Sequence, residues 1–277
     1  MGGLRGGLFM LLNFITWNVN PVLLHLGPFT VRWYGLLWAL GIYATLLIVQ
    51  KIFKHEQLPE VWVDKLFIYT VVGAIVGARL GHCLFYEWSY FSQHPLEILF
   101  IWHGGLASHG GAIGILIAIY FYNKKVSKKG YIWVFDRLVI GVAVCGAAIR
   151  LGNLMNSEIY GNATSMPWGF IFKRDPMGDG LPHHPTQIYE MIYCLVTFAI
   201  TWWLYWKKEA YKKTGLIFGV FLIGIFGSRF LLEFIKLDQE AFESGMILNM
   251  GQILSIPFII WGIWLIFRSR KLPIANK

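Results

Sequence analysis

Three arginines lie inside or at the edge of long apolar stretches of this sequence: Arg79, Arg150 and Arg229. An ionisable side chain in a hydrocarbon environment is costly, so an arginine at such a place marks a functional site by default. The guanidinium group carries a planar fork of donors that matches the oxygens of a phosphate or a carboxylate. The three residues therefore predict a site for an anionic ligand.

A histidine in a glycine-rich stretch supplies a candidate base. His109 lies in segment 104–114, which contains five glycines. Glycine lets a second helix or a ligand approach the backbone closely, and packing is the commoner reason for glycine in a membrane helix. Neutral imidazole is the ordinary base at physiological pH. We therefore expect His109 to accept a proton, with a purely structural histidine as the alternative.

Amide and carboxylate side chains follow Arg150 at short intervals. Asn153, Asn156 and Glu158 come before Gly161. The end of a helix running into a loop would explain one of the two asparagines, but not the density of hydrogen-bonding groups. We expect these side chains to orient Arg150 or a ligand.

Two further stretches carry polar residues at the ends of apolar runs. Arg229 and Glu233 are four residues apart, so they share a helix face and can pair. Such a pair neutralises a buried charge, and it can also orient Arg229 toward a phosphate. His184 comes before Pro185, which predicts the start of a helix. The histidines lack the spacing of a metal-binding pair on one helix face, so we expect no metal and no cofactor.

The composition is typical of a polytopic membrane protein. Of the 277 residues 56% are hydrophobic and 14% are charged, and the apolar runs are too long and too many for a water-soluble core. Most basic residues lie in short loops between these runs, so the net charge of +9 indicates orientation in a membrane and no nucleic-acid partner. The three cysteines are isolated within apolar runs, which argues against a disulfide framework or a thiolate metal site.

Seven apolar runs predict an all-α fold of seven transmembrane helices, because backbone polar groups in lipid must be satisfied within their own segment. Lysines and arginines follow the first, third, fifth and last runs, and they are absent from the intervening segments 87–103 and 237–250. By the positive-inside rule the N-terminus is outside and the C-terminus is cytoplasmic. At a rise of about 1.5 Å per residue, this topology places the three arginines and His109 toward the outer side. The expected spans are about 34–50, 66–86, 104–122, 131–149, 188–206, 215–235 and 251–267.

The same topology divides the chain into five segments. We expect an extracytoplasmic or interfacial segment at the N-terminus, because no clear small-residue cleavage site of a signal peptide follows its apolar run. The connection between the fourth and fifth spans is long and rich in proline and glycine, which predicts a small extracytoplasmic cap. The expected bounds are 1–33 for the N-terminal segment, 34–151 for four spans, 152–185 for the cap, 186–267 for three spans and 268–277 for a basic cytoplasmic tail.

Taken in order, these stretches resemble the prolipoprotein diacylglyceryl transferase family, and the resemblance runs from about Pro21 to Arg268. Each stretch alone is weak, but seven of them in order along the predicted spans make a specific signal. The residues that carry it are Gly27–Gly35, Gly77–Gly81, Ala107–Gly111, Arg150–Gly161, His184–Glu190, Arg229–Phe234 and Met250–Pro257.

The resemblance implies transfer of the diacylglyceryl group from phosphatidylglycerol to the lipobox cysteine of an exported prolipoprotein, with release of glycerol phosphate. It implies a multi-pass protein of the bacterial cytoplasmic (inner) membrane with its active site toward the outer leaflet. The catalytic residues implied are His109, Tyr34, Asn153 and Arg229. The residues implied to bind phosphatidylglycerol are Arg150, Arg229, Arg79, Asn156, Glu158, Gly161, Glu233 and His184.

Other functions also place arginines in a polar membrane cavity. An anionic-lipid transporter or flippase is the main alternative, although it would more often show internal symmetry, and no clear repeat is present. An intramembrane protease is less consistent with the sequence, because Ser108 and His109 are neighbours on a helix and point about 100° apart. A mass gain of one diacylglyceryl unit on a substrate peptide would separate the transferase from both.

Overall fold

The computed structural model describes residues 14–27, 29–101, 104–176, 178–237 and 248–271. The chain forms two compact units, and each is described by itself. The first unit comprises Met1–Thr45 and Leu138–Asn276, and the second runs from Leu46 to Arg137. Parts of the expected N-terminal segment and of the basic tail lie outside the described residues.

The described part of the chain contains six helices that are long and apolar enough to cross a membrane. The mostly helical architecture expected from the sequence is confirmed, and these helices correspond to six of the seven predicted spans. They are α2 (Trp33–His55), α3 (Glu60–Phe85), α6 (Tyr131–Met155), α7 (Thr186–Lys207), the segment Leu216–Ile235 and α10 (Met250–Lys271).

The third predicted span forms a shorter helix, α5, which runs from Ser108 to Tyr122 and has 15 residues. At about 1.5 Å per residue it rises roughly 22 Å, less than the hydrocarbon thickness of about 30 Å. A π-helix, η3 (Asn123–Ser127), continues it without a break. A seventh span would need both segments, and it stays a prediction.

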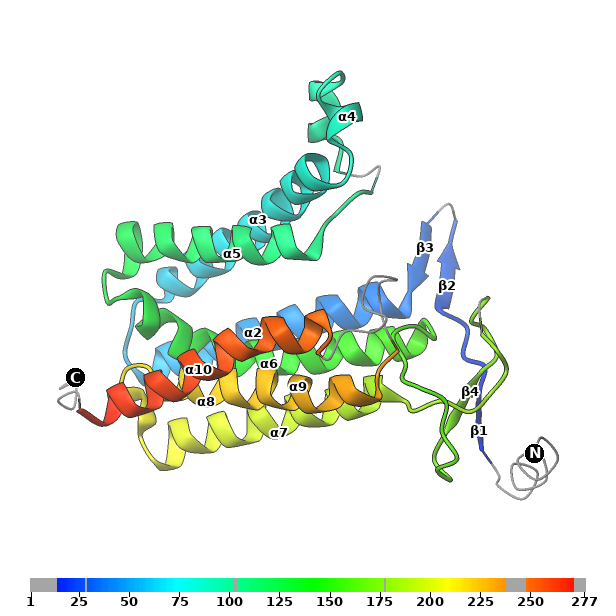
Figure 1. The fold of residues 1–277 in the computed structure, drawn as a ribbon. Helices are drawn as coiled ribbons and strands as arrows, with labels where there is room; N and C mark the ends of the chain where they lie inside the picture. Colours follow the sequence, from blue (N-terminus) through cyan, green and yellow to red (C-terminus); the bar gives the residue numbers. More distant parts are fainter. Residues whose placement is uncertain (1–13, 28, 102–103, 177, 238–247, 272–277) are drawn as a thin grey trace. The chain divides into compact units, whose positions relative to one another are not determined.

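The helices of the first unit pack with α8 (Leu216–Leu222) between α7 and α10, as Figure 1 shows. The predicted sixth span is not one regular helix. It continues from α8 through the π-helix η5 (Ile223–Gly227), the short helix α9 (Ser228–Leu232) and the 3₁₀ turn η6 (Glu233–Ile235). These changes of helix type alter the angular spacing of side chains along the segment.

Short strands, which the all-α prediction did not include, occur in the first unit. Strand β1 (Ile15–Trp17) pairs in parallel with β4 (Phe170–Phe172), and β2 (Val22–Leu26) pairs antiparallel with β3 (Phe29–Arg32). The indole of Trp17 packs against a small buried cluster of Leu154, Phe170 and Phe172, and its Nε1 donates to the Leu154 carbonyl at 2.9 Å. Strand β1 therefore packs on the connection between α6 and α7, and we call β1 together with residues 156–185 the cap.

The second unit is built on a close contact between α3 and α5. Each of Gly77 and Gly110 lies so near the other's carbonyl oxygen that a Cβ on either would collide with it, and Gly114 stands in the same relation to Gly73. Small residues allow two helix backbones to approach in this way. The chain between these helices forms α4 (Trp88–Phe91) and the 3₁₀ helix η1 (Pro95–Leu99).

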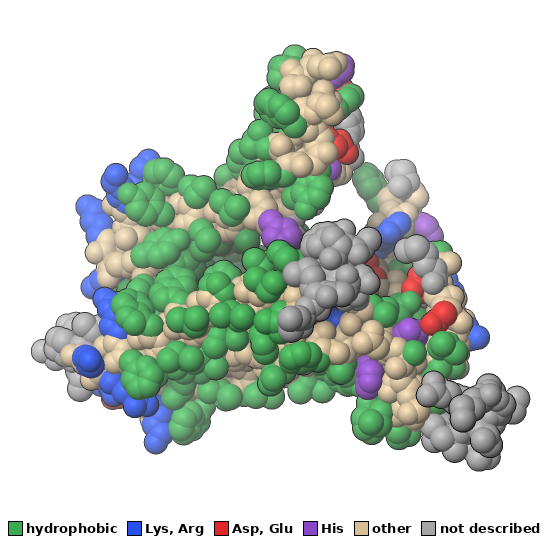
Figure 2. All heavy atoms as spheres, in the orientation of Figure 1, with side chains coloured by type: hydrophobic (Ala, Val, Ile, Leu, Met, Phe, Trp, Pro, Cys, Tyr) green, Lys and Arg blue, Asp and Glu red, His purple; other side chains and the backbone are tan. Residues whose placement is uncertain are grey.

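Charged side chains gather at one end of the helices within the first unit. Lys207 lies in the last turn of α7, and Arg268, Arg270 and Lys271 lie in the last turn of α10. Figure 2 shows hydrophobic side chains along the sides of α8 and α10 and basic side chains where α7 and α10 end. A surface of this kind suits a bilayer bounded by a polar interface.

Candidate active site

Arg150 forms the centre of a polar cluster in the first unit. It lies near the end of α6, and its Nε is 2.8 Å from Oε2 of Glu190 in the first turns of α7. Glu190 is fully buried, whereas the Arg150 side chain is 23% exposed. The contact is a charge contact outside hydrogen-bond geometry. One edge of the guanidinium thus faces a fixed carboxylate, and the Arg150 side chain remains partly exposed.

A second set of contacts reaches Arg150 from the turn that ends α6. Its Nη1 donates to Oδ1 of Asn153 at 3.3 Å, and Nδ2 of Asn153 donates to Oε1 of Glu158 at 2.8 Å. Asn156 also donates to that carboxylate oxygen, at 3.2 Å. Ser157 has a left-handed backbone, which turns the chain after the helix and brings Glu158 back beneath the two amides. The structure therefore brings together four residues that were expected from the sequence to lie in the site: Arg150, Asn153, Asn156 and Glu158.

Tyr34 lies against the same helix end from α2. A Cβ at Gly152 would lie 2.8 Å from Cδ2 of Tyr34 and 3.2 Å from its Cα. Only glycine lets α6 approach the tyrosine so closely. Gly152 is two residues after Arg150, so Tyr34 adjoins the segment that carries the cluster.

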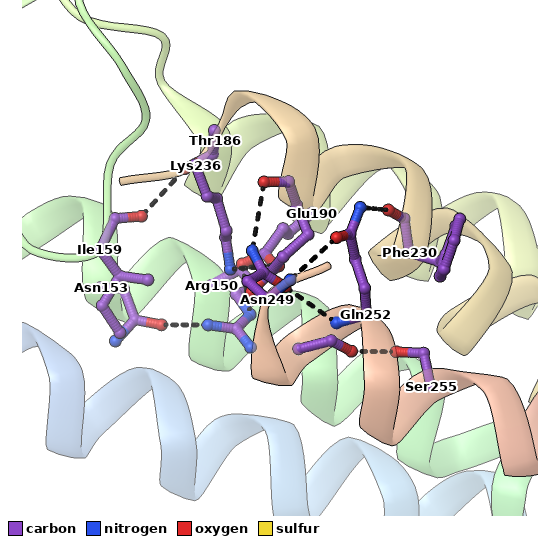
Figure 3. Close-up of polar contacts among 12 residues, drawn as sticks. Arg150, Asn153, Ile159, Thr186, Glu190, Phe230, Lys236, Asn249, Gln252 and Ser255 are labelled. Carbon is purple, nitrogen blue, oxygen red and sulfur yellow. Dashed lines mark hydrogen bonds and ion pairs between the residues drawn. The ribbon is translucent and has the colours of Figure 1, made fainter. Parts of the chain in front are cut away.

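Lys236 completes the cluster, and sequence reasoning missed it. Its side chain is 3% exposed, and its Nζ lies 2.9 Å from Oε1 of Glu190 and 3.7 Å from Oε2 of Glu233. Figure 3 shows Lys236, Glu190 and Arg150 gathered in one group, in which Glu190 pairs with both cations. A signal was present in the sequence, because a lysine at the outer end of a predicted span departs from the positive-inside pattern.

The four-residue spacing of Arg229 and Glu233 suggested an ion pair between them. Within the described residues, Glu233 does not form that pair. It is 5% exposed and faces Lys236 instead. The physical reason is local, because α9 ends at Leu232 and the 3₁₀ turn begins at Glu233, so the two side chains are not on a regular α-helical face. The Nε of Arg229 is buried and has no hydrogen-bond partner in the described part of the chain.

Gly161 lies where the cap crosses the end of the Leu216–Ile235 segment. Its N–H donates to the His184 carbonyl at 2.9 Å, and it forms a β-bridge with Lys236. A Cβ at this position would lie 2.5 Å from the Ile235 carbonyl oxygen and 2.7 Å from Cγ2 of Thr186. The glycine therefore allows cap backbone to pass directly beside Lys236.

His184 lies in the cap just before α7. Its Nδ1 is 3.2 Å from the hydroxyl of Tyr189. Burial lowers the pKa of His184, and the neighbouring His183 lowers it further. The neutral imidazole is thus the favoured form at this place.

Arg79 in the second unit is bound by backbone. It is 5% exposed, and its guanidinium donates to the carbonyls of Glu97 at 2.6 Å, Ile98 at 2.9 Å, Gly104 at 2.6 Å and Gly105 at 3.3 Å. The aromatic ring of Phe91 lies 4.9 Å from the guanidinium carbon. These contacts engage four of the five N–H donors of the guanidinium, on Nε and on both terminal nitrogens. The expected contact of Arg79 with an anion stays a prediction.

His109 is the second residue of α5, and it is exposed. It follows the segment that Arg79 binds, in the second unit. Arg150 and its partners belong to the first unit. That His109 lies close to the polar cluster around Arg150 stays a prediction.

Comparison with known proteins assigns the chain to a family. The family model for prolipoprotein diacylglyceryl transferase matches residues 21–268. The chain belongs to this family. A phosphatidylglycerol–prolipoprotein diacylglyceryl transferase of Porphyromonas gingivalis is 50% identical over 95% of this chain and 98% of its own length. Enzymes of the same name from Chloroherpeton thalassium and Tolumonas auensis are 46% and 44% identical, and the matches cover 94% and 92% of this chain and 96% and 97% of theirs.

These relatives confirm the family that the seven stretches indicated, and they identify the chain as a transferase. The region matched by the family model, 21–268, agrees with the range over which the resemblance was seen. The transporter alternative receives no support.

Proposed function

We propose that this protein transfers the diacylglyceryl group of phosphatidylglycerol to the lipobox cysteine of an exported prolipoprotein. The thiol sulfur attacks the glyceryl carbon that carries the phosphate ester. The C–S bond of a thioether forms while the C–O bond breaks, and glycerol phosphate leaves with the bonding electron pair. The thiol proton passes to a base.

The partly exposed side chain of Arg150, held beside a buried carboxylate, is the observation that carries this proposal. A phosphate group that leaves with additional negative charge needs fixed positive charge beside it, and donors held in place before the reaction stabilise that charge most effectively. Arg150 is held by Glu190 on one edge and by Asn153 on another, yet it is 23% exposed. We assign the phosphate contact to Arg150 and Arg229, with Asn153, Asn156 and Glu158 orienting Arg150.

The base we propose is His109. A thiol has a pKa of about 8.5 and is mostly protonated at neutral pH, so attack by sulfur needs a proton acceptor. General-base catalysis of this kind contributes roughly 10²–10⁴-fold. Exposure of His109 at the start of α5 is compatible with that role. Tyr34 adjoins the arginine cluster and is proposed to orient the lipid headgroup.

For Arg79, Gly161 and Glu233 the proposed roles become supporting ones. Arg79 fixes backbone next to His109, Gly161 lets the cap pass beside Lys236, and Glu233 faces that lysine. His184 remains a proposed headgroup contact at the start of α7.

We also propose the membrane setting given by the positive-inside rule, with seven spans, an outer N-terminus and an active site in the outer leaflet of the inner membrane. Within the first unit, the basic ends of α7 and α10 support a cytoplasmic location for those ends. The helix α5 together with η3 would supply the seventh span.

The experiment that tests the function incubates the purified protein with phosphatidylglycerol and a peptide that carries a lipobox cysteine, and measures the peptide by mass spectrometry. We expect a gain of one diacylglyceryl unit and stoichiometric glycerol phosphate. A peptide with serine in place of cysteine is the control, and it should gain nothing. An unchanged cysteine peptide, with lipid moved intact between leaflets of a vesicle, would contradict the proposal.

A further inference from the structure

The buried carboxylate of Glu190 is shared between two cations from different parts of the chain. Oε2 faces Nε of Arg150 at 2.8 Å, and Oε1 faces Nζ of Lys236 at 2.9 Å. Glu190 itself is 0% exposed and Lys236 is 3% exposed. A carboxylate buried to this degree depends on groups of the protein in place of water, and besides the two cations the Tyr193 hydroxyl donates to Oε1 at 3.5 Å.

The geometry of this sharing differs from that of an isolated pair of arginine and carboxylate. Left alone, a carboxylate and a guanidinium tend to form two parallel hydrogen bonds, which occupy two donors of the arginine. Here Lys236 contacts one carboxylate oxygen of Glu190. Within the described residues, the ion pair of Glu190 with Arg150 involves Nε of the arginine and neither terminal nitrogen. Within the described part of the chain, the terminal nitrogens of Arg150 are left with a single long contact, to Asn153 at 3.3 Å.

We propose that Lys236 is a positioning residue that keeps the terminal nitrogens of Arg150 available to a phosphate by dividing the charge of Glu190. This inference rests on the proposed function, because it assigns Lys236 a part in binding the headgroup of phosphatidylglycerol. Arg150 and Lys236 face two carboxylates, Glu190 and Glu233, so removal of Lys236 alone leaves this group with a net negative charge.

Lys236 also has the connections that such a role needs. Its backbone forms a β-bridge with Gly161 of the cap, and its own 3₁₀ turn carries Glu233, 3.7 Å from its Nζ. The lysine is thus fixed by backbone and by a second carboxylate. Its ammonium group is therefore held in position, where it competes with Arg150 for the carboxylate of Glu190.

The test compares three variants by their steady-state constants for phosphatidylglycerol. In Lys236→Met the Glu190 carboxylate is no longer shared between two cations, so both of its oxygens can pair with Arg150. KM for phosphatidylglycerol should then rise roughly tenfold or more. Glu190→Gln/Lys236→Met restores the net charge of the group and frees Arg150, so KM returns most of the way toward the wild-type value. Glu190→Gln alone loosens Arg150 without neutralising it, so kcat falls while KM does not rise.

A purely structural ion pair would give a different pattern. Each single variant would then lower the thermal midpoint and the activity together, and the double variant would not recover KM. We expect Lys236→Arg to retain KM, because it keeps the charge. Lys212→Met is the matched control, because it removes a lysine from an ion pair with Glu209 whose carboxylate is 58% exposed, and it should leave KM unchanged.

Direct binding separates this inference from the proposed function. Displacement of a fluorescent phosphatidylglycerol from each variant in detergent micelles should follow the same order as KM. If the wild type binds the lipid with this charge dependence and transfers nothing to the peptide, the proposed function fails and the inference holds. If Lys236→Met binds and turns over as the wild type does, or the double variant is no better than Lys236→Met, the inference is wrong.

Discussion

Arg79 and Arg150 lie in apolar helices of the two units, and the structure uses them in opposite ways. Arg79 gives hydrogen bonds to four backbone carbonyls in segment 97–105. Arg150 meets one carboxylate through Nε and one amide through Nη1. The two also differ in exposure: Arg79 is 5% exposed with four of its five N–H donors bound to carbonyls, and the Arg150 side chain is 23% exposed.

The comparison shows two ways of holding an arginine in an apolar helix: by neutral backbone carbonyls, as for Arg79, or by a carboxylate and an amide, as for Arg150. The second arrangement is the one that we propose to bind a ligand. Backbone carbonyls are neutral, so they accept hydrogen bonds from Arg79 but do not neutralise its positive charge. Such a cation ties a loop in place. A carboxylate placed beside one edge of a guanidinium fixes its orientation and leaves the other edge for a ligand. Sequence alone does not distinguish the two, because the partners come from distant parts of the chain.

The largest effect is expected for Arg150→Lys. An ammonium group cannot form the planar fork and would reach Glu190 without presenting a second edge to phosphate. Loss of one preorganised donor to a developing anion costs roughly 10²–10³-fold in kcat. The measurement is peptide lipidation by the purified variant, with its thermal midpoint as a check on folding. Turnover within a few-fold of the wild type would show that Arg150 does not contact the reacting phosphate.

Arg79→Lys should lower stability and activity together. A lysine can replace one or two of the four hydrogen bonds, and each buried carbonyl left without a donor costs about 1–3 kcal/mol. The segment before α5 should then become sensitive to protease, which gel analysis and mass spectrometry of fragments would detect. KM for phosphatidylglycerol should change little in the fraction that remains folded. A large rise in KM with unchanged protease resistance would instead favour a direct contact of Arg79 with lipid.

Gly114→Ala should destabilise the second unit by about 1–3 kcal/mol through overpacking. The added Cβ would collide with the Gly73 carbonyl, which is backbone and cannot turn away. Gly35→Ala in α2 is the matched control, because no atom lies within 4 Å of a Cβ there and alanine favours a helix. Thermal unfolding in detergent would measure both. Equal midpoints for the two variants would show that the α3–α5 contact is looser than described.

The sequence predicted the helices well, because each depends on a local apolar run. The fourth expected span, about 131–149, became α6 at Tyr131–Met155, and the fifth, about 188–206, became α7 at Thr186–Lys207. The grouping of Arg150, Asn153 and Glu158 was also predictable, since all three lie within nine residues of one helix end.

Other features depend on contacts between distant residues, and the sequence did not predict them. Strands β1 and β4 pair although more than 150 residues separate Trp17 from Phe172. The carbonyl partners of Arg79 have no side-chain signature. The position of Lys236 departs from the positive-inside pattern, but its pairing with Glu190 depends on a contact between two different helical segments. The change of helix type before Glu233 has no clear sequence signal.

The smallest expected effect is on the pH dependence of stability, which should depend on His184 in the cap and not on Arg150 in the polar cluster. Burial lowers the pKa of His184 below its ordinary value of about 6.5, so the unfolded chain binds more protons than the folded one just below that pH. The free energy of unfolding should therefore fall as pH drops through about 6.5 toward the lowered pKa. His184→Gln removes this group, and its thermal midpoint should fall less than that of the wild type between pH 7.5 and pH 5.5. Arg150→Lys should keep the wild-type pH dependence, since arginine and lysine stay protonated throughout this range. Parallel midpoints for the wild type and His184→Gln would mean that protonating His184 costs the folded cap nothing.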